Sequence, residues 1–174
     1  ITSTWAAAAT VHHDLEVRIQ PDQNSLQVVN RVSFLDAVTP DENGAYRFVP
    51  HAGLEPKVAT PGWRLQLQDG PAEARVVGST ARTETVPENV PLDAYLLIPE
   101  GESPGPVELV YGGVIHHELA TQGEEYQRSF SETPGIIDDR GVFLAGASFW
   151  VPTFGDGLMT FDLVVGGLTP PWDV

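Results

Sequence analysis

The sequence contains no cysteine among its 174 residues. Disulfide bridges, thiol nucleophiles and cysteine-ligated zinc are therefore all excluded. Cationic residues are also scarce, because 9 Lys and Arg stand against 24 Asp and Glu, for a formal net charge of −15. Nucleic acids and anionic membranes are bound mainly through Lys and Arg, so neither is expected as a partner. The plainest use of the many carboxylates is a hydrated, charged surface.

Long apolar runs are missing as well. None approaches the roughly 18 residues needed to span a bilayer, so no membrane span is expected in this segment. Residues 1–10 include the run Ala6 to Ala9 but lack the basic stretch that opens a signal peptide, and we treat them as an N-terminal extension. These residues are compatible either with the start of a mature exported chain or with a boundary chosen inside a longer chain. The compartment stays open, with an exported or periplasmic location favoured over a cytoplasmic one.

A sustained helical period is the third absence, since no 3.6-residue repeat of apolar residues runs for a dozen positions. Instead, 15 Pro and 17 Gly separate short apolar runs, which is typical of an all-β chain. Apolar and polar residues alternate over 15–19 and again over 26–34, with turn residues between, which predicts a long hairpin. Further strands are predicted at 46–49, 56–59, 63–67, 74–77, 95–98, 107–115, 142–149 and 158–165.

Short strands at this spacing, with no helix between them, favour an antiparallel β-sandwich or a saddle of packed sheets over a βαβ fold. The polar stretches 78–92 and 119–139 are predicted to be surface loops. The length suffices for one core and is too short for two comfortable ones. Because no repeat or interdomain linker is found, residues 11–174 are interpreted as a single all-β domain.

The stretch His116-His117-Glu118 resembles part of the zinc-protease motif H-E-x-x-H, which places two imidazoles on one face of a helix. When the motif is counted from His117, its fifth position is Thr121, which cannot replace an imidazole as a zinc ligand. The residues before it are β-branched and Gly-punctuated, which predicts a strand, and neighbouring side chains of a strand point to opposite faces. His116 and His117 are therefore not expected to bind one ion together.

A second histidine pair, His12-His13, also lies on a predicted strand. One ring from each pair could meet across a sheet and bind a metal beside a carboxylate. The preferred alternative is that each pair places one ring inward, hydrogen-bonded, and the other outward. No G-x-S-x-G nucleophile elbow is present, because the nearest fragment, residues 146–149, lacks its second glycine. No catalytic residue and no metal ligand is assigned.

Aromatic residues gather in the stretch Phe149-Trp150-Val151-Pro152, followed by Phe154. This cluster between two predicted strands is interpreted as a plug of the core in preference to a platform that stacks on a ligand.

Four motifs occur in an order that resembles one known family. They are the hairpin with His12, residues 14–19, Pro21 and Leu26; the strand 111–115; the stretch 134–152, with its G-x-I and G-V-x-L-x-G-x-S-x-W pattern; and the strand 161–165 followed by 171–174. Together they resemble the N-terminal domain of the alanyl-aminopeptidase-like zinc metallopeptidases, the gluzincin group, and its bacterial members in particular. That domain is an all-β saddle, in agreement with the predicted strands.

The resemblance implies a domain that is inactive by itself. It would pack on a catalytic domain of the same chain and form one wall of the substrate cleft. Peptide would be the substrate of the whole protein. The zinc, the H-E-x-x-H…E site and the G-A-M-E-N loop belong to that catalytic domain; neither motif occurs in the 174 residues, so the chain itself is expected to hold no cofactor.

The family's amine-anchoring residue would fall near residues 146–149. The side chains expected closest to substrate are therefore Gly146, Ala147, Ser148, Phe149 and Trp150. Where many members have Gln or Glu, this chain has Ala147 and Ser148, so an endopeptidase, a differently anchored exopeptidase and an inactive member all stay open. The alternative to the family is a free-standing β-sandwich that binds protein or carbohydrate, which predicts a closed core and an exposed platform of Trp and Tyr.

Overall fold

The computed structural model describes residues 10–35, 38–70, 72, 76–77, 83–84, 90–101, 105–118, 133–155 and 158–168. The expected N-terminal extension falls outside these residues except for Thr10, as do residues 169–174. The strands are β1 (Thr10–Gln20), β2 (Ser25–Leu35), β3 (Tyr46–Val49), β4 (Lys57–Val58), β5 (Trp63–Leu67), β6 (Val76–Val77), β7 (Thr83–Glu84), β8 (Tyr95–Pro99), β9 (Val107–Val114), β10 (Gly135–Ile137), β11 (Val142–Leu144), β12 (Thr153–Phe154) and β13 (Leu158–Gly166).

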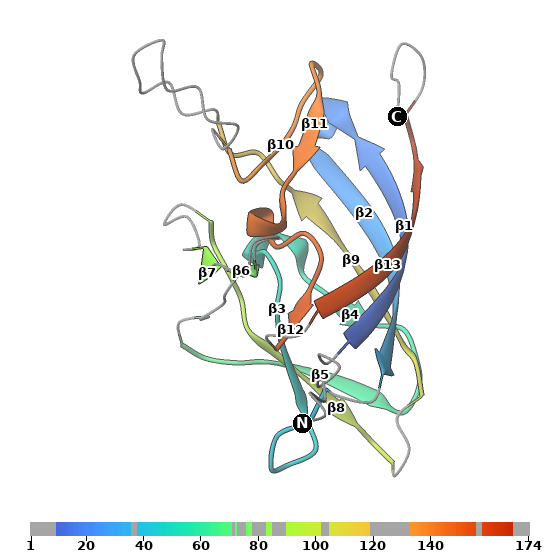
Figure 1. The fold of residues 1–174 in the computed structure, drawn as a ribbon. Helices are drawn as coiled ribbons and strands as arrows, with labels where there is room; N and C mark the ends of the chain where they lie inside the picture. The colour runs from blue at the N-terminus through green and yellow to red at the C-terminus, as the bar shows by residue number, and fades with distance from the viewer. Residues whose placement is uncertain are drawn as a thin grey trace, which may run out of the picture.

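The all-β fold expected from the sequence is confirmed: strands in packed sheets make up the described chain (Figure 1). Three short 3₁₀ turns interrupt them, namely η1 (Pro21–Gln23), η2 (Ala52–Leu54) and η3 (Gly146–Ser148). No helix in the described part of the chain has the length and apolar character required to cross a bilayer.

The larger sheet has five strands in the order β13-β1-β2-β9-β4. The predicted hairpin forms its centre, with β1 and β2 paired from Thr10 opposite Leu35 to Gln20 opposite Ser25. One pair in this otherwise antiparallel sheet is parallel, because β13 returns from the far end of the chain and lies beside β1. The smaller sheet has the order β12-β3-β8-β5 and is antiparallel throughout.

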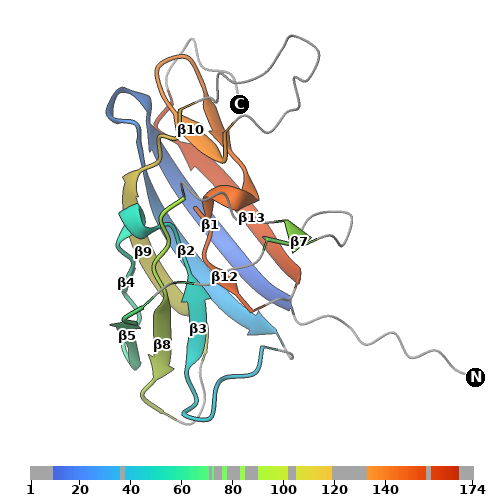
Figure 2. The same ribbon diagram turned by 90° about the vertical axis from the view of Figure 1, so that its left-hand side faces the viewer.

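The two sheets pack face to face, and their facing side chains form one core (Figure 2). In β1 the odd-numbered residues from Val11 to Ile19 are buried while the even-numbered ones are more accessible, as the period of two in the sequence predicts. The smaller sheet contributes Tyr46, Phe48 and Leu97 to the same cluster. Burial of apolar surface on one face of each sheet is therefore what holds the two layers together.

Three local predictions are wrong, the smallest being the loop predicted over 78–92, which contains the two-residue strand β7. The strand predicted over 142–149 ends at Leu144, because the chain then turns through η3 to Phe149, whose left-handed backbone (φ 52°) also lies outside the β region. The loop predicted over 119–139 contains the strand β10, which pairs with β11 and is fully buried, as its apolar Ile136 and Ile137 require. Residues 119–132 of that loop, and most of the loop predicted over 78–92, lie outside the described residues.

A chain of polar side chains crosses the core of the larger sheet. His13 on β1 is fully buried, and its Nδ1 lies 3.1 Å from the Oδ1 of Asn30 on β2. The amide of Asn30 donates in turn to the hydroxyl of Tyr111 on β9, at 3.3 Å. The other ring nitrogen of His13, Nε2, has no hydrogen-bond partner among the described residues. Such a ring is tolerated in an apolar core only while it is neutral, since an unpaired buried charge is costly.

Acidification is expected to destabilise the protein through His13. Burial lowers the pKa of His13 from 6.5 to about 4, against a smaller opposing effect of the hydrogen bond to Asn30. Between these two pH values the unfolded chain binds a proton that the native chain does not. The free energy of unfolding should therefore fall as the pH drops from 6.5 to 4, by about 3 kcal/mol in full.

Urea titrations at a series of pH values measure this slope. The His13→Gln variant, which keeps a polar partner for Asn30, should show a flatter profile over the same range, whereas His12→Gln on the accessible face of β1 should retain the slope. An identical slope in His13→Gln would show that another group is responsible.

Close contact between β9 and η2 generates a second prediction. A Cβ built on Gly113 would lie 1.8 Å from the carbonyl oxygen of Gly53, whereas one built on Gly141 would meet nothing within 4 Å. Gly113→Ala should therefore lower the free energy of unfolding by about 3 kcal/mol, because backbone atoms must separate to accept the methyl group. Gly141→Ala is the matched control and should be nearly neutral. Chemical denaturation compares them, and equal stabilities would contradict the close packing.

Candidate functional site

The segment expected closest to a substrate, residues 146–150, forms η3 and the two residues after it, between β11 and β12. Gly146 is exposed, and Ala147 and Trp150 are partly accessible. Ser148 and Phe149 are buried. The hydroxyl of Ser148 donates to the carbonyl oxygen of Ala145 at 2.7 Å, so it is engaged in the turn itself. Any molecule docking here would meet Gly146, Ala147 and Trp150, and not the serine hydroxyl.

Phe149 holds this turn in place. Its backbone is left-handed (φ 52°, ψ 32°), which is unfavourable for a bulky residue and is seen most often where the surrounding structure enforces it. Its N–H donates to the carbonyl oxygen of Gly146, its own carbonyl accepts the N–H of His51, and its side chain is 1% exposed. Trp150 and Phe154 also pack in or against the core. The interpretation of this aromatic cluster as a plug of the core is therefore confirmed.

The hydrogen bond from His51 to the Phe149 carbonyl brings a histidine pair next to this turn. The backbone N–H of Gly53 donates to His51 Nδ1 at 3.0 Å, so in the neutral ring the proton sits on Nε2. That nitrogen lies 3.1 Å from Nε2 of His117, with the two rings edge to face at 65°. His51 therefore donates to His117, which then carries its own proton on Nδ1.

Both imidazoles of this pair favour the neutral state. Burial lowers the pKa of His51, and the neighbouring charge of His117 lowers it further. Burial also lowers the pKa of His117, with His116 as the second cause. Two nitrogens at 3.1 Å can share one proton but cannot both be protonated without strong repulsion. Chemically, the pair offers a neutral hydrogen-bonding group beside the 146–150 segment.

Sequence reasoning missed this pair because it matched His12 and His13 only with His116 and His117. His51 follows β3 in the smaller sheet, while His117 follows β9 in the larger one, so only the packing of the two sheets brings them together. A lone histidine after a short strand gives no signal of such a contact in the sequence.

The remaining histidines behave largely as predicted. His13 is inside and hydrogen-bonded, and His12 is on the accessible face of β1, as the preferred alternative stated. The neighbours His116 and His117 have different partners: Nδ1 of His116 lies 3.2 Å from the Asn24 amide nitrogen, and His117 contacts His51. They are not arranged to bind one ion together.

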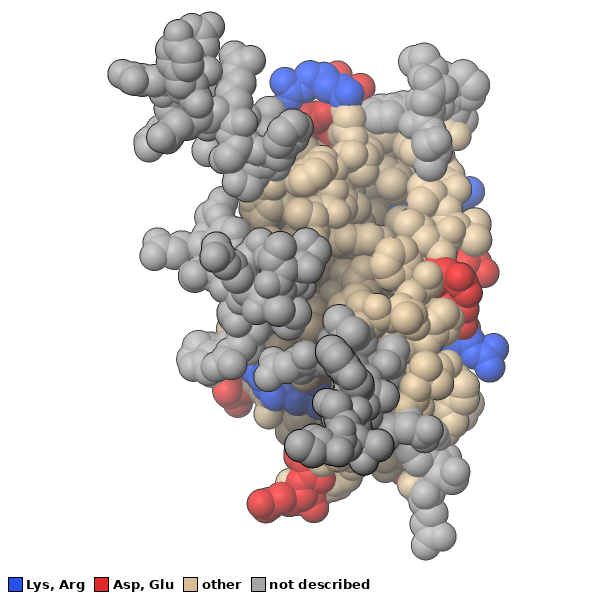
Figure 3. Space-filling view, viewed as in Figure 1, with Lys and Arg blue, Asp and Glu red and all other residues tan. Residues whose placement is uncertain are grey.

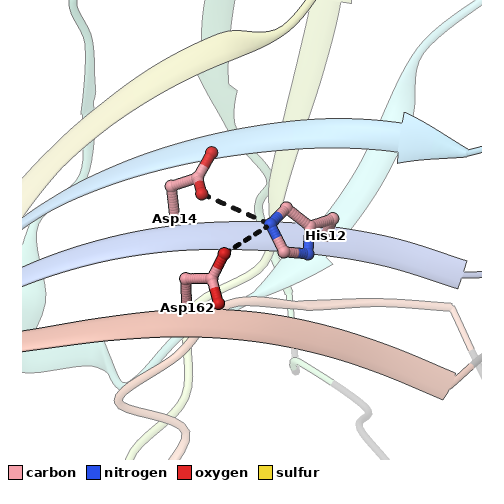
Figure 4. A group of neighbouring side chains, drawn as sticks. All are labelled: His12, Asp14 and Asp162. Atoms are coloured by element: carbon pink, nitrogen blue, oxygen red, sulfur yellow. Dashed lines mark hydrogen bonds and ion pairs between the residues drawn. The ribbon is translucent and has the colours of Figure 1, made fainter.

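His12 belongs instead to a group of possible metal ligands with Asp14 and Asp162, on neighbouring strands of the larger sheet (Figure 4). No member of the 146–150 segment takes part in it.

A second surface of interest is the inward face of β13. Phe161 and Leu163 lie opposite His13 and Leu15 of β1, and thus on the side of the sheet that forms the core. Yet Phe161 is 57% exposed and Leu163 is 43% exposed, because no described strand of the smaller sheet reaches over β13. In the view of Figure 3, uncharged surface fills the middle of the molecule and the charged groups lie toward its margins.

The outer face of the larger sheet carries a shallow groove of about 640 Å³. Aliphatic and charged side chains line it, among them Arg18, Val29, Lys57 and Val164. Exposed aromatic rings, on which a sugar would stack, do not line it. The described Trp and Tyr residues pack in or against the core, namely Tyr46, Trp63, Tyr95, Tyr111 and Trp150. The platform expected of a carbohydrate-binding module is therefore absent from the described residues.

No protein-family model matches the chain, and no curated protein or solved structure matches it.

The histidine pair generates a prediction for NMR. Replacing His117 by Gln removes a nearby ionisable group, so the pKa of His51 should rise toward its ordinary value. Heteronuclear spectra of the imidazole nitrogens, recorded from pH 4 to 8, measure both titrations in the native chain and that of His51 in the variant. His12→Gln is the control and should leave the pKa of His51 where it is. An unchanged pKa in His117→Gln would mean that the two rings do not interact.

Proposed function

We propose that this chain is a non-catalytic β domain of an alanyl-aminopeptidase-like zinc metallopeptidase. Its role is to pack on a catalytic domain of the same protein and to form one wall of the peptide-binding cleft. The observation that carries the proposal is the uncovered inward face of β13, where Phe161 and Leu163 continue the core face of the sheet into solvent. Large exposed apolar side chains in a row mark contact surfaces more often than free surface.

The way β13 extends the sheet supports a domain contact in preference to a small ligand. Met159, Phe161 and Leu163 follow one another with the period of a strand and are each more than one-third exposed. They lie in register with Val11, His13 and Leu15, which the smaller sheet covers. A partner that covers β13 would extend this apolar layer by one strand, as one domain packs on another.

The predicted substrate segment and β13 lie on the same side of the molecule. Both η3 and β13 face the viewer in Figure 1 and lie toward the right in Figure 2. A domain docked on this side would therefore meet the inward face of β13 and enclose the surface around Gly146, Ala147 and Trp150. Clefts between domains are where substrates are commonly bound. In this arrangement the ring of His117 supplies a neutral hydrogen-bonding group close to the wall, whereas both ring nitrogens of His51 are already engaged.

Catalysis in this proposal belongs to the partner domain. Zinc bound there by an H-E-x-x-H…E motif would activate water and polarise the scissile carbonyl. The turn that resembles the family's amine-anchoring segment has no carboxylate or amide side chain, since Ala147 and Ser148 occupy it. In this chain the turn itself therefore supplies no side chain that could hold the free amine of a peptide.

Peptidase assays on the purified chain and on the product of the complete reading frame test this proposal. A panel of aminoacyl and internally quenched peptides covers both exopeptidase and endopeptidase activity. We expect hydrolysis by the longer product alone, together with about one chelator-sensitive zinc per catalytic domain. Hydrolysis by the 174-residue chain alone would contradict an accessory role, and a longer product without a peptidase motif would contradict the family.

Variants of β13 test the docking face directly. In the longer product, Phe161→Ser with Leu163→Ser should raise hydrogen exchange across β13 and lower the unfolding temperature of the assembled domains, because the buried apolar contact is lost. Val164→Ser is the matched control, since Val164 is 65% exposed on the opposite face of the same strand. Equal effects of the double variant and the control would show that the inward face is not the contact.

A further inference from the structure

Three potential ligand atoms converge on the outer face of the larger sheet. The register of β1 and β13 places Asp14 directly opposite Asp162 (Figure 4), and it places His12 opposite Thr160. His12 Nε2 lies 3.3 Å from Oδ1 of Asp14 and 3.6 Å from Oδ2 of Asp162. All three atoms lie within 4.8 Å of one another. Such separations suit three ligands of one cation bound at the usual distance of about 2.1 Å.

The charges of this group favour a positive centre between its members. Like charges directly opposite one another on paired strands are unfavourable, and Asp14 and Asp162 are such a pair. Within the described ranges, the ion pairs of both aspartates are with His12 alone. Arg31 stands opposite Asp14 on the other neighbouring strand, but no ion pair joins them in the described part of the chain. A cation held between the three side chains would remove the repulsion.

The orientation of the imidazole fits a metal ligand. Nδ1 of His12 lies 2.9 Å from the hydroxyl of Thr160, across the strand pair. When Nδ1–H donates to that hydroxyl, the lone pair of Nε2 points toward the two carboxylates. A hydrogen bond from the second ring nitrogen is what fixes the tautomer and the ring angle of metal-binding histidines in general. The competing arrangement, with the proton on Nε2, can satisfy only one carboxylate at a time with a linear hydrogen bond.

We propose that His12, Asp14 and Asp162 form a divalent cation site that prefers Zn²⁺ and ties β13 to β1. One imidazole nitrogen and two carboxylate oxygens are ligands that Zn²⁺ accepts, with water in the remaining position. Ca²⁺ favours six to eight oxygen ligands and Mg²⁺ favours octahedral oxygen, so both should bind more weakly. The site is separate from the zinc of the proposed catalytic domain and does not depend on that proposal.

The expected consequence is a metal-dependent anchoring of the edge strand. β13 is bonded to the sheet along one edge only among the described strands, through its parallel pairing with β1. Two ligands from β1 and one from β13 make the cation a cross-link between these strands. Since the unfolded chain does not hold the three ligands together, binding should stabilise the native state.

Calorimetric titration and thermal unfolding of the chelator-treated chain test the proposal with Zn²⁺, Mn²⁺, Ca²⁺ and Mg²⁺ as separate probes. We expect one Zn²⁺ to bind with a dissociation constant in the micromolar range and to raise the unfolding temperature by several degrees. Asp162→Asn and His12→Gln should each weaken binding at least tenfold. The Asp162 side chain is 83% exposed, so its variant should fold normally. Asp69→Asn, an exposed aspartate elsewhere, is the control.

Thr160 is expected to act as a positioning residue. Thr160→Val should weaken Zn²⁺ binding because the imidazole loses its orienting hydroxyl, while Thr160→Ser should restore it. Histidine Nε2 and Nδ1 chemical shifts in the Zn²⁺-loaded chain report directly which nitrogen is the ligand, and we expect Nε2.

The histidine pair His51 and His117 is the main competing site for Zn²⁺, so the titrations are repeated in a His117→Gln background. Binding that persists in this background and disappears with Asp162→Asn supports the proposal. Binding that disappears with His117→Gln and survives Asp162→Asn overturns it, as does a lack of any response to Zn²⁺ at millimolar concentration.

Discussion

The parallel pairing of β13 with β1 is the interaction on which both proposals depend. It joins residues almost 150 positions apart, since His12 stands opposite Thr160. On one face of the pair it brings Asp162 to His12 and Asp14, and on the other it extends the core face of the sheet beyond the reach of the smaller sheet. A strand whose two faces both meet solvent contributes little to the core of this chain, which is why its side chains are available for contacts with a metal ion or a partner domain.

Neutral imidazoles are a second feature that the core and the candidate cleft wall share. His13 is neutral because it is buried with one nitrogen unpaired, and His51 with His117 because each is partly buried beside another histidine. Burial and like charge act in the same direction on all three. The core and the candidate cleft wall are therefore both better suited to neutral than to acidic conditions.

The fold was largely predictable from the sequence, while the sites were not. Short apolar and alternating runs located β2, β3, β5, β8, β9 and β13 to within a residue at each end, because one buried face imposes a period of two wherever a strand lies on a core. For β1 the alternation marked only residues 15–19 of a strand that begins at Thr10. It failed over residues 145–149, where the chain leaves the strand after Leu144 and turns through η3 to the left-handed Phe149. The contacts of His51 with His117, and of His12 with Asp162, depend on which strands become neighbours, and local pattern carries no information about parallel pairing across the whole chain.

The distance in sequence between β1 and β13 also has a kinetic consequence. The β1–β2 hairpin closes through a four-residue connection and can form early, whereas β13 can dock only after more than 140 residues have been placed. During synthesis the outer edge of β1 therefore remains unpaired until β13 has been made. Its backbone donors and acceptors can bind a strand of another chain in that interval. The rate at which β13 docks on β1 would then decide how much newly made chain reaches the native state and how much associates with other chains. The stability of the finished sheet would matter less.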